Sequence, residues 1–137
     1  MERAVTVDGL TTIKSSFGPK ETLDRLETLA KSRGMNVFAR IDHAAGAGSA
    51  GLSLRPTEVL IFGSPVGGTP LMQAMQTIGL DLPLKALAWQ DAAGDSWLSY
   101  NDPVWLARRY GIPGDTEAVI KLSTALTAVT MAATKSS

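Results

Sequence analysis

A short apolar strand constrains the fold of this chain more than any other feature of its sequence. Residues Val59 to Phe62, VLIF, contain no polar side chain, which is typical of a strand that lies inside a sheet and is covered on both faces. An alanine- and glycine-rich crossover, residues 43–51, precedes the strand, and a glycine-rich segment, residues 63–68, follows it. We therefore expect this strand in the middle of a sheet, with the two irregular segments converging on a shared hollow.

The hydrophobic periodicity of the chain predicts a single α+β domain over residues 1–137, in which helices pack on a mixed or mostly antiparallel sheet. A chain of 137 residues suits one domain with one core. Strands are expected at residues 10–16, 35–42, 57–62, 84–90 and 96–100, a short helical turn at residues 43–51, and helices at residues 20–33, 70–78, 103–111 and 115–132.

Two strand patterns give sharper expectations. In residues 35–42 the odd-numbered positions are apolar, so they should form one continuous buried face. The strands on either side of residues 91–95 should pair as a hairpin, with Trp89 facing Trp97 and Ala88 facing Leu98. An aromatic pair of that kind adds about 0.5–1.5 kcal/mol beyond the burial of its area.

Composition limits the classes of function. Thirteen basic and thirteen acidic residues cancel, so no overall field attracts nucleic acid or an anionic membrane. The chain has no cysteine, which excludes disulfides and cysteine-ligated metals. The start, MERAVTVDGL, lacks the apolar segment of a signal peptide, and no apolar run has the length of a spanning helix. A cytoplasmic protein that binds neither nucleic acid nor a membrane is the expectation.

Several short motifs together resemble the domain of unknown function 302 family. The resemblance covers about residues 10–112 in the family's order, and the last helix is also similar to the family's C-terminal segment. It implies an α+β fold and a small homodimer, and it implies no reaction. The motifs are IDHA at residues 41–44, GL and LRP at 51–52 and 54–56, VLIFGSP at 59–65, GTPLM at 68–72, LDLPLK at 80–85 and YNDP at 100–103.

His43 is the candidate for chemistry, because it is the single histidine and follows a strand end. Its ordinary pKa near 6.5 suits general acid–base catalysis, and Asp42 could orient its ring. The alternative is a structural histidine that binds a backbone carbonyl group. One histidine and scattered carboxylates have no recognised metal-ligand spacing, so no metal site is expected, and no motif identifies a cofactor.

Residues 63–69 have the outline of an anion-binding loop, because they follow a buried strand and precede a helix. Thr69 should cap that helix and Pro70 should be its first residue. The P-loop lysine and spacing are missing. The alternative is a tight turn that needs glycine. The candidate ligand contacts are Gly63, Ser64, Gly68 and Thr69, with Arg40 and Lys85 as possible partners of an anion.

Three hypotheses about function follow. The first is a homodimeric module that binds a small ligand, with an anion as one candidate, between His43 and the segment Gly63–Thr69. The second is an enzyme that uses His43 as a general acid or base. The third is a structural or protein-interaction domain without a ligand, whose contact surface is the last helix. Whether the chain catalyses a reaction is left open by its sequence.

Overall fold

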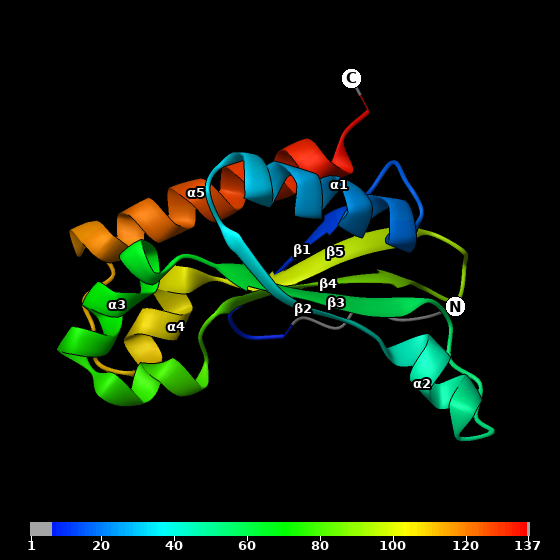
Figure 1. Ribbon diagram of the computed structural model, residues 1–137, viewed down its shortest axis with the longest axis horizontal. Coiled ribbons are helices and arrows are strands. Elements are labelled where there is room, and N and C mark those ends of the chain that lie inside the picture. The colour runs from blue at the N-terminus through cyan, green and yellow to red at the C-terminus, as the bar shows by residue number, and fades with distance from the viewer. Residues whose placement is uncertain (1–6, 137) are drawn as a thin grey trace.

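The computed structural model describes residues 7–136, which form a five-stranded, fully antiparallel sheet with helices on one face and at one end (Figure 1). The strand order is β1-β5-β4-β3-β2. The predicted α+β architecture with a C-terminal helix is confirmed. The elements are β1 Leu10–Lys14, α1 Pro19–Ser32, β2 Asn36–Asp42, α2 His43–Ser49, β3 Thr57–Gly63, α3 Pro65–Ala74, the 3-10 helix η1 Gln76–Leu80, β4 Leu84–Gln90, β5 Ser96–Asn101, α4 Pro103–Arg109 and α5 Glu117–Thr134.

The apolar strand β3 lies inside the sheet, between β2 and β4, as predicted. The expectation that both faces of this strand are covered is wrong. Leu60 and Phe62 are fully buried beneath α1 and α5, whereas Val59 and Ile61 on the other face are only partly buried. We call that other side of the sheet the open face, because Figure 1 shows α1 and α5 together on the opposite side.

The predicted alternation of β2 breaks in the middle of the strand. Val37 pairs with Phe62, but Ala39 pairs with Ile61, so one residue is inserted between them as a β-bulge. The insertion moves every later side chain to the opposite face. Ile41, expected in the core, is therefore 44% exposed on the open face. Local alternation could not reveal the bulge, because it depends on the pairing with β3.

The predicted hairpin of β4 and β5 is confirmed in its register. Trp89 pairs with Trp97 and Ala88 with Leu98, and the two indole rings stack with their centroids 6.2 Å apart. The Asp91 carboxylate organises the turn, because it accepts hydrogen bonds from two turn amides and from the Trp97 indole N–H at 2.9 Å. These hydrogen bonds lower the pKa of the Asp91 carboxyl, and the bond from the Trp97 indole has the largest effect.

Helix α3 begins at Pro65, five residues before the predicted first residue Pro70, so the expected loop at residues 63–68 is mostly helical. Ser64 rather than Thr69 is the cap, and its hydroxyl accepts a hydrogen bond from the Val66 amide at 3.2 Å. Pro65 takes the first helical position, which suits its fixed φ and missing N–H. Pro70 consequently lies inside the helix.

Helix α5 connects two clusters of the core. Its inward residues include Val119, Leu126 and Val129, each at most 1% exposed, as the periodicity predicted. Leu126 and Val129 belong to the cluster between the sheet and α1, and Val119 to the cluster with α3 and α4. Thr130 is also fully buried although its side chain is polar, and its hydroxyl group is satisfied there by donating to the Leu126 carbonyl at 2.7 Å.

Candidate functional site

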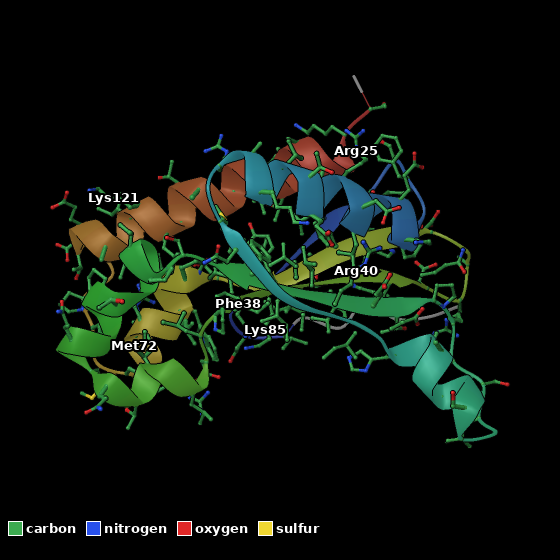
Figure 2. All side chains as sticks on the ribbon, in the orientation of Figure 1. Arg25, Phe38, Arg40, Met72, Lys85 and Lys121 are labelled. Carbon is green, nitrogen blue, oxygen red and sulfur yellow. The ribbon has the colours of Figure 1, made fainter. Side chains whose placement is uncertain are left out.

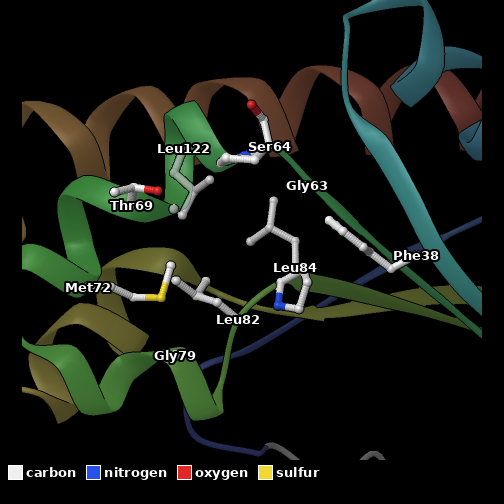
Figure 3. A pocket seen from close by; sticks show the side chains of 12 residues that line it. Phe38, Gly63, Ser64, Thr69, Met72, Gly79, Leu82, Leu84 and Leu122 are labelled. Atoms are coloured by element: carbon white, nitrogen blue, oxygen red, sulfur yellow. The ribbon is translucent and has the colours of Figure 1, made fainter.

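A pocket of about 220 Å³ lies where β3 ends and β4 begins, next to α3, η1 and α5 (Figure 3). We call it the inner pocket. Four of the predicted ligand contacts line it together, namely Gly63, Ser64, Gly68 and Thr69. Their convergence follows from one short connection, since the chain leaves β3 at Gly63 and enters α3 two residues later.

The rest of the inner pocket is apolar. Met72 of α3, Leu122 of α5 and Phe38 of β2 surround it in Figure 3, and no charged side chain lines it. Gly68 keeps it open, because a Cβ atom built there would contact the Leu82 and Met72 side chains at 3.6 and 3.7 Å. The remaining lining residues are Pro65, Gly79, Leu82, Pro83 and Leu84.

The anion-binding loop expected here does not form with free amides. The amides of Gly67 and Gly68 both donate to the Ser64 carbonyl at 3.0 Å, and the Val66 amide donates to the Ser64 hydroxyl. The first turn of α3 thus satisfies its own donors. An apolar pocket without amides directed at it suits a small apolar group better than a phosphate.

A second hollow, the charged groove, adjoins the inner pocket and has a volume of about 450 Å³. It runs between α3 and α5 to the end of α1. Arg33, Glu117 and Lys121 line it, and the Glu117 carboxylate and Lys121 ammonium lie 3.0 Å apart. The Lys121 ammonium lowers the pKa of the Glu117 carboxyl, mainly through its hydrogen bond and further through its charge. The other lining residues are Met35, Gly63, Ser64, Val66, Gly67, Pro70, Leu84, Ala118, Leu122 and Ala125.

His43 and Asp42 do not meet the inner pocket. Asp42 pairs with Glu58 at one end of the β2–β3 ladder, whereas Gly63 pairs with Asn36 at the other end. The hollow expected between the two glycine-rich segments is therefore absent from the described residues. His43 is exposed at the start of α2, and the Asp42 carboxylate caps that helix by accepting from the Ala45 amide at 2.9 Å. An acid–base role for His43 stays a prediction.

Arg40 and Lys85 also lie away from the inner pocket, on opposite faces of the sheet (Figure 2). Arg40 forms ion pairs with Asp24 of α1 and with Glu58 of the neighbouring strand β3. Lys85 is exposed on the open face, in a shallow hollow of about 270 Å³ shared with Leu87 and Trp89. Neither cation can therefore pair with a ligand in the inner pocket without a large movement.

Several residues of this site were not predicted as site residues. Phe38 reaches the inner pocket because it lies at the bulge of β2, and Leu122 reaches it from a helix more than 50 positions away along the chain. Met72 was recognisable beside the apolar stripe of its helix.

Among residues 7–136 no cluster of three or more metal-ligating side chains occurs. None of the helices that the structure describes has both the length and the hydrophobicity needed to span a bilayer.

Comparisons with known proteins identify relatives of the whole fold. Residues 11–129 match the family described as "Domain of unknown function DUF302". A crystal structure of an uncharacterized conserved DUF302 protein from Bacillus stearothermophilus superimposes with a TM-score of 0.82 and 22% identity, covering 94% of this chain and 100% of that chain.

Curated relatives are longer proteins. The chain is 54% identical over 113 residues to "Fluoride-specific ion channel FluC 1" of Brucella suis and to the protein of the same name in Brucella abortus. The match covers 82% of this chain but 44% and 42% of those two proteins. The chain thus spans less than half the length of these relatives.

Proposed function

The chain belongs to the DUF302 family, and since that family is defined without a reaction, we propose a function from the site itself: the chain is a module that binds a small, largely apolar ligand in the inner pocket. The observation that carries this proposal is the pocket of about 220 Å³, lined by apolar side chains, which Gly68 leaves open. Ligand sites in proteins are typically apolar concavities with a few polar groups. Here Ser64 and Thr69 supply the hydroxyl groups.

A leucine at Gly68 tests the proposal by filling the pocket. The first added carbon makes ordinary contacts of 3.6 Å or more, and a helical glycine replaced by leucine gains helix propensity, so the variant should fold. Octan-1-ol at 100 times its Kd should stabilise the natural protein by about 2.7 kcal/mol. We expect Gly68→Leu to lose that stabilisation in a thermal-shift measurement.

The matched control is Gly46→Leu, a glycine of α2 where a Cβ atom meets nothing within 4 Å. This variant should respond to octan-1-ol like the natural protein. Equal responses of Gly68→Leu and Gly46→Leu, or no response of the natural protein to any of a panel of small aliphatic and aromatic alcohols, would contradict the proposal.

We propose in addition that the chain forms a homodimer through the open face of the sheet, with a second copy as the partner. Supporting this, Phe38, Ile41 and Leu10 are 54%, 44% and 39% exposed there. Five strands about 4.8 Å apart make a face roughly 24 Å wide. Together with the projecting α2, it approaches the roughly 800 Å² per partner of a standard interface.

The curated relatives favour a second candidate function, a role that supports fluoride transport. Their printed names concern a fluoride-specific ion channel, and the matched segment is less than half of each protein. We propose that this chain assists such a channel as an accessory domain. Deletion of its gene should lower the fluoride concentration at which cells stop growing, and expression of the chain should restore it; unchanged growth would contradict this role.

A further inference from the structure

We propose that the site takes a single-chain amphiphile, whose alkyl chain occupies the inner pocket and whose carboxylate lies in the charged groove. The inference rests on the proposed function, because it names the ligand class for the same pocket. It depends on three observations: the two hollows share four wall residues, no charged side chain lines the inner one, and two cations and one anion line the outer one.

The two hollows are neighbours with shared walls. Gly63, Ser64, Leu84 and Leu122 line both the inner pocket and the charged groove. The two glycines of α3 divide between them, since Gly68 lines the inner pocket and Gly67 the groove. We infer from these shared walls that a ligand longer than the inner pocket extends past Ser64 and Leu122 into the groove.

The inner pocket suits an alkyl chain rather than a larger apolar body. Its volume of about 220 Å³ is below the roughly 300 Å³ at which pockets for drug-sized ligands begin. Met72, with an unbranched and polarizable side chain, forms part of its wall, and such a wall adapts to a flexible chain. Each methylene group buried in the pocket should raise the affinity about fourfold.

The charged groove favours an anionic head group. Of its three charged side chains, Arg33 and Lys121 are cations and Glu117 is the single anion. Lys121 binds Glu117 at 3.0 Å, so a carboxylate competes with Glu117 for Lys121 and gains the charge of Arg33. Because Lys121 and Glu117 are 76% and 81% exposed, each contact changes affinity by a modest factor.

Calorimetric titration with octanoate and octan-1-ol, which share one chain and differ in charge, tests the inference. Lys121→Gln and Arg33→Gln should each weaken octanoate binding about two- to fivefold and leave octan-1-ol binding unchanged. Glu117→Gln should strengthen octanoate binding by a similar factor, because it frees Lys121 and removes a repulsive charge. Gly68→Leu should abolish binding of both compounds.

The outcomes separate this inference from the proposed function. Octan-1-ol binding that depends on Gly68, together with octanoate binding that ignores all three charge variants, overturns the amphiphile and leaves the apolar pocket standing. Octanoate binding that persists in Gly68→Leu also overturns it. Failure of the natural protein to bind either compound overturns the amphiphile, and the proposed function falls with it when the panel of small alcohols gives no response either.

Discussion

At the scale of single residues, four acceptor groups surround the guanidinium of Arg40. Its Nη1 lies 2.7 Å from Asp24 Oδ1 and 3.6 Å from Glu27 Oε1, its Nε lies 3.0 Å from Glu58 Oε2, and its Nη2 donates to the Lys20 carbonyl at 3.1 Å. Burial lowers the pKa of Arg40, but the hydrogen bonds to Glu58 and Asp24 outweigh it and raise the pKa overall. The charge of Arg40 thus ties β2 and β3 to α1.

Arg40→Ala should lower the free energy of unfolding by about 1–3 kcal/mol, because it leaves three neighbouring carboxylates without their shared cation. Urea denaturation followed by tryptophan fluorescence measures the loss. The control is Lys14→Ala, which removes an exposed pair with Asp95 at 3.7 Å and should cost less than about 1 kcal/mol. Equal losses in the two variants would show that the Arg40 cluster adds nothing to stability.

At the scale of elements, the turn before β1 packs directly on α4. The Gly9 backbone has φ +75°, and a Cβ atom there would lie 2.2 Å from Cδ2 of Trp105. The Gly9 carbonyl also accepts a hydrogen bond from the Asp102 amide, which precedes α4, at 2.7 Å. Contact between the first strand and a helix that begins more than 90 residues later therefore requires a glycine at this position.

Gly9→Ala should lower the free energy of unfolding by about 2–4 kcal/mol, since it combines left-handed strain with a clash against the indole ring. Gly34→Ala is its control: the backbone after α1 has φ +79°, but a Cβ atom there meets nothing within 4 Å. That variant should lose about 1–2 kcal/mol, from backbone strain alone. Thermal denaturation of both proteins gives the difference, and the expectation fails if Gly9→Ala is no less stable than Gly34→Ala.

At the scale of the whole molecule, the two faces of the sheet are unequal. Helices α1 and α5 cover one face, and apolar side chains of the strands remain accessible on the other. Helix α5 also joins both clusters of the core. Removal of residues 114–137 would therefore expose that core, and such a truncation cannot test whether the last helix is a contact surface.

Two lysine substitutions distinguish the candidate dimer interfaces. Ile41 is 44% exposed on the open face, and Ile120 is 51% exposed on α5. If two copies pair through the open face, Ile41→Lys should convert dimer to monomer and Ile120→Lys should not, because a charge buried at an interface is costly. Light scattering gives the mass of each variant. Loss of the dimer in Ile120→Lys alone would favour the last helix instead.

Most elements of this fold were predictable because their causes are local. The stripe of α5, the glycine after α1 and the Trp89–Trp97 register of the hairpin each depend on residues close together in the sequence. The start of α3 was predicted five residues late, because Ser64-Pro65 and Thr69-Pro70 both have the form of a helix start. Only the first pair directly follows the end of β3.

The amino-acid sequence by itself determined the strand β3, the helices that cover one face of the sheet, and four residues of the inner pocket, since periodicity and turn chemistry act over a few positions. Tertiary structure alone decided which end of β3 holds the pocket. Antiparallel pairing carries His43 to one end of the strand and Gly63 to the other, and the bulge in β2 turns Phe38 into the pocket wall. The register of two strands is set by their mutual contacts, which neither strand specifies alone.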